Sequence, residues 1–268
     1  MKKDQMRKVN RLSLALLFVS ISFNVFAQRA DTMIMKQEPT LKYGQSTPTN
    51  GLLEKAVFIG VPIAMVTYGY CALDNDKLME INLNTKTEIR EDYPRFATSV
   101  DNYLQFAPAV AVYGLNAMNV PGKNNFRDRS MIYLLSTVFM STTVRGLKNA
   151  THEQRPDGSD YLSFPSGHTA TAFAAAEFLR QEYKDQSIWY GIAGYGVATA
   201  TGALRMYNNK HWFSDVVAGA GIGILSTEMA YWVYPPIKKL LFKDKSPKVL
   251  IVPNYNNRNL GLGMMVKL

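Results

Sequence analysis

The sequence predicts an all-α protein, a helical bundle of about six apolar helices, with a short β-hairpin at its C-terminus. The first observation is composition: 19% of the 268 residues are charged and 47% are hydrophobic, whereas about 25% of a typical soluble domain is charged. The second is patterning, because apolar residues form long uncharged runs, several near the roughly 18 residues that indicate a membrane span. We therefore expect the bundle to be membrane-embedded. The buried helices of a soluble bundle are the alternative.

The N-terminal residues 1–27 have the features of an export signal. A basic start precedes the apolar stretch 12–23, and Ala27 offers a small residue for cleavage. An uncleaved membrane anchor is the alternative interpretation. Residues 28–51 are polar and contain two prolines, so we expect a lead-in without regular structure.

The predicted helical domain spans residues 52–245. Five runs in it contain no charged residue, and a shorter sixth run ends at Glu177. Several of these runs are rich in Gly, Ala and Thr, which allow helices to approach closely in lipid. We expect one helix from each run: residues 56–73, 102–122, 130–144, 166–176, 186–204 and 216–227.

The last segment, residues 246–268, differs from the rest. Residues 248–252 have strand character, residues 254–259 contain turn formers, and apolar residues alternate from 260 to 268. This pattern predicts a short hairpin, whose role the sequence leaves open.

Charge and cysteine content exclude some functions. The net charge is +9, but five basic residues against one acidic residue in the leader account for part of it. The remaining charge lacks the basic and aromatic interleaving of a nucleic-acid groove, so we expect no nucleic-acid partner. Cys71 is the only cysteine, which excludes an internal disulfide and a cysteine-based metal site.

Three short polar segments, here called the polar islands, interrupt the apolar runs. They are residues 148–156 with Lys148 and Arg155, residues 165–168 with Ser166, Gly167 and His168, and residues 205–215 with Arg205, His211 and Asp215. Basic residues in the connections 123–129, 180–184 and 238–245 predict that these connections face the cytoplasm. The islands would then share the opposite, periplasmic side. A cleaved signal followed by six crossings would instead place them inside, so the number of crossings stays open.

The islands carry the residue types that phosphate transfer needs. On a helix, His211 and Asp215 would share a face, and a carboxylate on one ring nitrogen leaves the other with a free lone pair. His211 is therefore a candidate nucleophile. A surface His–Asp pair and a plain helix cap at Ser166 are the simpler readings of the individual motifs.

The second island and the cations would bind and protonate the substrate. Residues 165–168 precede an expected helix from Thr169 to Ala176, whose N-terminus would offer free N–H groups to anionic oxygens. His168 could protonate a leaving oxygen. Lys148, Arg155 and Arg205 match the charge of phosphoryl oxygens, although cations that flank membrane helices are common. We also expect Pro156 to end the preceding helix and to turn Arg155 towards the phosphate-binding site that the islands would form.

Together the islands resemble the three-part signature of the type 2 phosphatidic acid phosphatase (PAP2) family. Its superfamily also includes bacterial acid phosphatases and vanadium haloperoxidases. The resemblance covers about residues 130–234 and departs at Leu204, where the family commonly has serine. It implies an all-helical core and hydrolysis of a phosphate ester with no metal and no cofactor. His211 would form a phospho-histidine, Asp215 would orient it and His168 would protonate the leaving oxygen. The phosphate would be held by Lys148, Arg155, Ser166, Gly167 and Arg205.

The resemblance implies a phosphorylated lipid as the substrate and a membrane as the location. Candidate substrates are phosphatidate, phosphatidylglycerol phosphate, polyprenyl diphosphate and the phosphate of a lipid A-like glycolipid. A secreted, soluble, non-specific acid phosphatase is the first alternative, favoured by the leader and the mean hydropathy of -0.11. A catalytically silent lipid-binding membrane protein is the second. The oligomeric state stays open.

Overall fold

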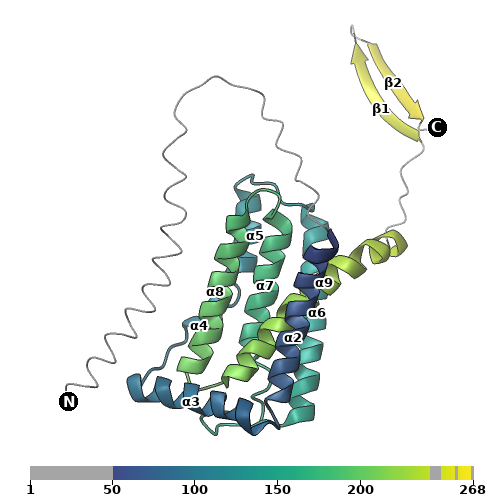
Figure 1. The fold of residues 1–268 in the computed structure, drawn as a ribbon. Coiled ribbons are helices and arrows are strands. Elements are labelled where there is room, and N and C mark those ends of the chain that lie inside the picture. Colours follow the sequence, from purple (N-terminus) through teal and green to yellow (C-terminus); the bar gives the residue numbers. More distant parts are fainter. Residues whose placement is uncertain (1–50, 242–248, 257–258, 267–268) are drawn as a thin grey trace, which may run out of the picture. The chain divides into compact units, whose positions relative to one another are not determined.

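The computed structural model describes residues 51–241, 249–256 and 259–266. The predicted signal and all but the last residue of the lead-in lie outside these residues. The described part of the chain contains eight helices and two strands (Figure 1). The helices are α2 Gly51–Cys71, α3 Asp76–Asp92, α4 Val100–Leu104, α5 Ala107–Ala117, α6 Phe126–Thr151, α7 Gly167–Tyr183, α8 Ile188–Tyr207 and α9 Phe213–Leu241.

Every uncharged run forms helix, which confirms the all-α prediction for the bundle. The number of helices differs from the expected six for two reasons. The run 102–122 divides into α4 and α5 because α5 begins anew with a proline in its first turn, a position where the missing N–H costs nothing. The connection between α2 and α4 contains α3, capped by Asn75, whose side chain accepts the N–H groups of Lys77 and Leu78.

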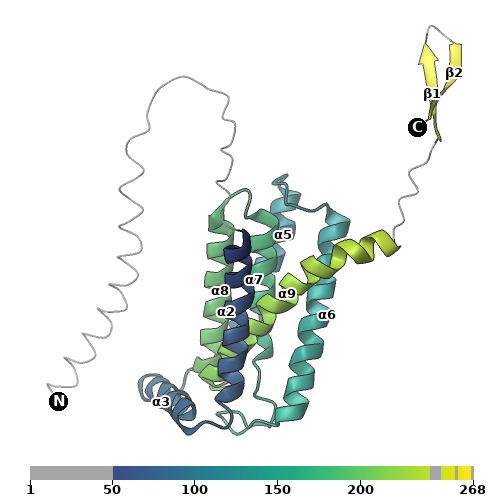
Figure 2. The ribbon, with the colours of Figure 1, turned by 45° about the vertical axis from the view of Figure 1, so that its right-hand side comes forward.

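Helix α7 lies at the centre of the bundle and packs against α5, α6, α8 and α9 (Figures 1 and 2). Its buried face is largely alanine, including Ala172, Ala174 and Ala176, and these small side chains allow neighbouring helices to approach closely. The contact with α9 is close: a Cβ on Gly219 would lie 2.5 Å from the carbonyl oxygen of Ser166. Glycine at this position therefore lets α9 pass directly beside the start of α7.

Chain direction brings the polar islands to one end of the bundle. Helices α6 and α8 end there, whereas α7 and α9 begin there. The basic segments at the start of α6 and at the ends of α7 and α9 consequently lie at the opposite end. The bundle thus has one end that carries the islands and another that carries basic residues.

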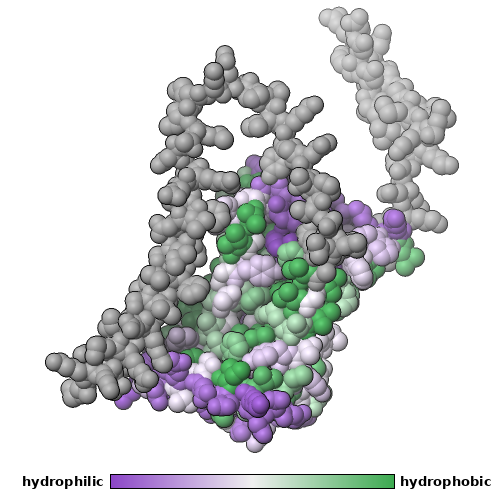
Figure 3. Space-filling model, viewed as in Figure 1, coloured by the Kyte–Doolittle hydropathy of each residue, from purple (hydrophilic) through white to green (hydrophobic). Residues whose placement is uncertain are grey.

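The face of the bundle shown in Figure 3 has an apolar zone between its two ends. On the face shown in Figure 3, hydrophobic residues cover the middle of the helices, and hydrophilic residues gather at both ends. Among the described residues, the helix Phe213–Leu240 is long and apolar enough to cross a membrane. The pair Val57–Cys71 and Asp76–Asp92, bent by 91°, adds a second span if it is counted as one. The described residues therefore contain one or two candidate membrane spans, fewer than the uncharged runs in the sequence.

The C-terminal strands β1, Val249–Asn256, and β2, Asn259–Val266, pair in an antiparallel two-stranded sheet. Val249 lies opposite Val266, and Asn256 lies opposite Asn259. The ladder therefore extends into the residues 254–259 that the sequence indicated as a turn.

Candidate active site

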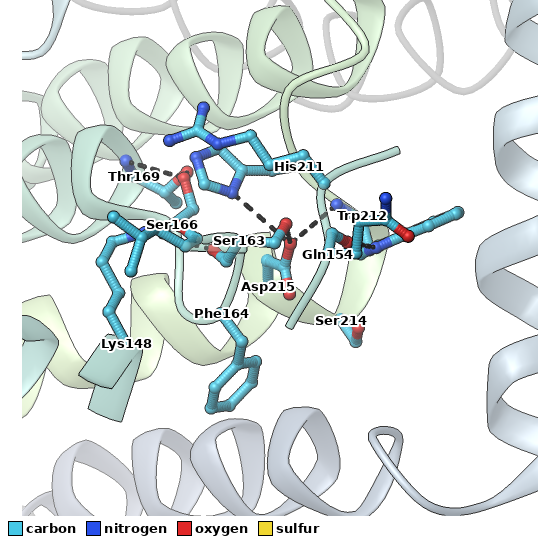
Figure 4. Close-up of polar contacts among 12 residues, drawn as sticks. Lys148, Gln154, Ser163, Phe164, Ser166, Thr169, His211, Trp212, Ser214 and Asp215 are labelled. Carbon is cyan, nitrogen blue, oxygen red and sulfur yellow. Dashed lines mark hydrogen bonds and ion pairs between the residues drawn. The ribbon is translucent and has the colours of Figure 1, made fainter. Parts of the chain in front are cut away.

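The three polar islands meet at one end of the bundle (Figure 4). The backbone N–H of Ser166 donates to the carbonyl of Asp215 over 3.0 Å and joins the second island to the third. Lys148, in the last turn of α6, donates from Nζ to the carbonyls of Leu162 and Ser163. These contacts connect the first island to the segment that leads into α7. Ser166, Asp215 and Lys148, one residue from each island, therefore lie in one neighbourhood.

His211 and Asp215 form a buried pair. His211 is 3% exposed, and its Nδ1 lies 3.4 Å from Oδ2 of Asp215. The same oxygen accepts the Trp212 backbone N–H over 2.9 Å and the Ser163 hydroxyl over 2.5 Å. His211 itself precedes α9, so Asp215 reaches it from the first turn of that helix. The carboxylate is fixed by these donors and orients the imidazole so that Nε2 is left for a ligand.

The electrostatic surroundings keep His211 neutral. Burial lowers the pKa of His211 well below its usual value, and the charges of Lys148, Arg205 and Arg155 lower it further. Since a neutral imidazole retains a lone pair, His211 is available as a nucleophile at neutral pH. These causes also show that the three predicted cations lie close enough to act on the same ring.

The second island forms the start of α7, which begins at Gly167 and not at Thr169 as the sequence predicted. Ser166 is the N-cap, and its side chain accepts the N–H of Thr169. His168 lies in the first turn, with Nε2 2.8 Å from Oδ1 of Asn102. Burial, followed by the charge of Arg205, lowers the pKa of His168 to about 4. The negative charge of a bound phosphate would oppose the cations and raise that pKa, which favours the protonated form needed to protonate a leaving oxygen.

Two of the cations are held by carboxylates of the protein. Arg155 Nε lies 2.7 Å from Asp160 Oδ1, and Arg205 Nη1 lies 2.6 Å from Asp101 Oδ2. The Nε of Arg205 is buried and has no hydrogen-bond partner among the described residues. The carboxylates therefore fix each guanidinium and leave further N–H groups to bind phosphoryl oxygens.

The expectation that Pro156 ends α6 was wrong. The helix ends at Thr151, and His152 adopts a left-handed conformation with φ 49°, its N–H donating to the carbonyl of Lys148. A turn then orients Arg155, whose backbone N–H donates to the carbonyl of Asp160. The helix is thus terminated by a C-cap four residues before the proline.

Three residues of the site were missed at the level of the sequence. Asp101 holds Arg205, Asn102 contacts His168, and Ser163 donates to Asp215. Asp101 and Asn102 lie at the start of an uncharged run, and Asp101 is a buried acid there. An acidic residue at the edge of an apolar run is expected to be buried and therefore to need a partner. This signal in the sequence could have identified Asp101.

A pH dependence follows from Lys148. Burial and then the charge of Arg155 lower its pKa to about 8. A group that binds phosphate as a cation loses this function above its pKa, so we expect kcat/KM to fall as pH rises through about 8. In Lys148→Arg the guanidinium stays charged, and the alkaline fall should move to higher pH. Measuring kcat/KM on both sides of pH 8 for both proteins checks this, and an unchanged alkaline limb in the variant would contradict it.

The described residues contain no group of three or more His, Cys, Asp or Glu side chains that could hold a metal ion.

Comparisons with known proteins found a matching family model and two similar relatives. Residues 129–239 match the model described as the PAP2 superfamily. The chain is 40% identical over 150 residues to a lipid A 1-phosphatase of Porphyromonas gingivalis, covering 56% of this chain and 33% of that protein. It is 32% identical over 100 residues to the bacitracin transport permease protein BcrC of Bacillus licheniformis, covering 36% of this chain and 47% of the relative. The chain thus spans less than half the length of each of these relatives.

A solved structure is also similar. It is the first transmembrane PAP2-type phosphatidylglycerolphosphate phosphatase from Bacillus subtilis, at a TM-score of 0.48 and 18% identity. The match covers 67% of this chain and 98% of that one.

Proposed function

Because residues 129–239 of this chain belong to the PAP2 superfamily, we propose that the protein is a metal-independent phosphatase. Its substrate is a lipid phosphate monoester or diphosphate, and the reaction passes through a phospho-histidine. The observation that carries this proposal is the buried His211, paired with Asp215 and surrounded by Lys148, Arg155 and Arg205. The similarity to a lipid A 1-phosphatase supports a lipid as the substrate class.

The reaction takes place in two steps. Nε2 of His211 attacks phosphorus, the bond to the leaving oxygen breaks, and His168 gives its proton to that oxygen. Asp215 stabilises the positive charge that develops on the imidazole. His168 then removes a proton from a water molecule that attacks the phospho-histidine, which releases inorganic phosphate and restores His211.

The cations and the start of α7 stabilise the transition state. Lys148, Arg155 and Arg205 neutralise the charge on the phosphoryl oxygens. The N–H groups at Gly167 and His168 and the hydroxyl of Ser166 add donors at a helix N-terminus, where the helix dipole also favours an anion. A Cβ on Gly167 would lie 3.7 Å from Val144, an ordinary packing distance. Internal packing therefore does not require glycine there, which supports a role for Gly167 towards the phosphate.

The surface supports a position in the membrane. Large apolar side chains are exposed on helices α2, α6, α8 and α9, and Trp232 on α9 is 75% exposed. Exposed apolar area on this scale is typical of a surface that contacts lipid or a partner. The basic end of the bundle would face the cytoplasm, so the site lies at the periplasmic side of a bacterial inner membrane, at the level of lipid head groups.

One assay tests the proposed function. The purified protein is offered phosphatidate, phosphatidylglycerol phosphate, polyprenyl diphosphate and lipid A in the presence of a chelator, and free phosphate is measured. We expect release from at least one of them. Release that occurs only after a divalent metal is added would contradict the mechanism. Carbonate extraction of cells tests the location, because an embedded protein stays with the membrane and a soluble periplasmic phosphatase does not.

A further inference from the structure

A cavity of about 410 Å³ adjoins the site on the side of His168. Lys148, Gly167 and His168 line it, whereas His211 and Arg205 are not among its lining residues. The cavity therefore opens beside the group that we propose to protonate the leaving oxygen. Its volume falls in the range of about 300–1,000 Å³ that is usual for small-molecule sites and exceeds what one phosphate group needs. This is where the leaving group of the substrate would lie.

Arg145 adds a cation to this cavity that the family signature does not include. It lies on α6, three residues before Lys148, so both side chains project from the same face of the helix. Arg145 lines the cavity, and with Asn149 and Ser141 it also lines an adjoining hollow of about 420 Å³. The positive charge thus extends from the phosphate site along α6.

The side chain of Arg145 is exposed and makes no ion pair or hydrogen bond with the rest of the chain that the structure describes. This differs from Lys148, Arg155 and Arg205, which carbonyls or carboxylates hold in place. No carboxylate occurs among the residues that line either hollow. The guanidinium is therefore not neutralised locally and faces the leaving-group side with its donors available.

The remaining lining residues define the chemistry of the ligand. Gln105, Asn149 and Thr171 supply polar atoms, while Met140 and Val144 supply apolar surface. A guanidinium surrounded by amide and hydroxyl groups matches an anionic, oxygen-rich group and binds phosphate bidentately. The apolar residues fit the hydrocarbon part of the same ligand.

We propose that Arg145 is a specificity-determining residue that binds a second phosphate group on the leaving portion of the substrate. This inference rests on the proposed phosphatase function and narrows its substrate class to lipids with two phosphates. The second phosphate is either linked directly to the first, as in a polyprenyl diphosphate, or separated from it by an alcohol, as in phosphatidylglycerol phosphate. Phosphatidate, whose leaving group is uncharged, gains nothing from Arg145.

The test compares specificity ratios in Arg145→Gln. The ratio is kcat/KM for a doubly phosphorylated lipid divided by kcat/KM for phosphatidate, measured in the same detergent. We expect the ratio to fall about tenfold, mainly through KM, which is the loss expected when one hydrogen bond to a charged group is removed. Arg145→Lys should recover part of the loss because it restores the charge. A fall for polyprenyl diphosphate alone or for phosphatidylglycerol phosphate alone identifies where the second phosphate is attached.

Arg95→Gln is the matched control. Arg95 is exposed in the segment between α3 and α4 and lines neither hollow, so the same change in net charge should leave the ratio unaltered. A ratio in Arg145→Gln that equals the wild-type value, or one that falls equally in the control, would overturn the inference while phosphatase activity stands. Absence of phosphate release from every lipid in the wild-type protein would instead refute the proposed function.

Discussion

Replacing His211 by alanine is expected to reduce phosphate release by roughly 10⁴-fold to 10⁶-fold, the scale seen when a nucleophile is removed. The side chain is buried beside Asp215 and under the influence of three cations, and no other imidazole among the described residues occupies such a position. Measuring kcat with the best lipid of the panel checks the loss. Mass spectrometry of enzyme quenched in alkali during turnover should detect a phosphorylated His211 in the wild-type protein.

His152→Asn serves as the control for this prediction. His152 is exposed and ends α6 in a left-handed conformation, which asparagine also tolerates. Its activity should stay within about twofold of wild type, since no part of the mechanism uses it. If His211→Ala kept substantial activity while its thermal unfolding matched the wild type, the phospho-histidine would be excluded.

Asp215→Asn is expected to lower kcat by roughly 10³-fold to 10⁴-fold with a smaller effect on KM, as happens when a histidine loses its orienting carboxylate. The amide keeps the size of the side chain and can still accept the Trp212 N–H. It removes the negative charge that stabilises the imidazolium-like state of His211 and changes which ring nitrogen carries the proton. Steady-state kinetics at several pH values measure both effects.

Ser163→Ala separates orientation from charge in this pair. It removes the 2.5 Å hydrogen bond to Asp215 but leaves the carboxylate with its contacts to Trp212 and His211. A loss of about tenfold or less is expected, since one hydrogen bond is worth about 1 kcal/mol. Equal losses in Ser163→Ala and Asp215→Asn, with both variants folded, would show that the charge of Asp215 does not act on the reaction.

The positions of the helices could be read from the sequence because they depend on local patterns. Uncharged runs mark α2, α6, α7, α8 and α9, although each of these helices extends beyond its run at one or both ends. Helix α3 was missed because it is polar. The division between α4 and α5 was missed because an uncharged run carries no mark of a break except its proline. The end of α6 was misplaced because histidine, unlike glycine, does not indicate a left-handed C-cap in the sequence.

The candidate site likewise has features that the sequence predicted and features that only the structure showed. The spacing of residues within each island predicted the proposed chemistry. His211 and Asp215 are close in the chain and form a local contact, and Ser166 and His168 both lie at the start of α7. Only the tertiary structure decided what holds these groups. Asp101 reaches Arg205 across 104 residues, and Ser163 reaches Asp215 across 52.

The sequence by itself predicted the helical class of the protein and the residues that we propose to perform the reaction. The tertiary structure alone decided which partners fix those residues and that Arg145 faces a cavity beside His168. The physical reason is that helix formation and motif spacing act over a few residues. Ion pairs and cavities arise only where packed helices bring distant segments together.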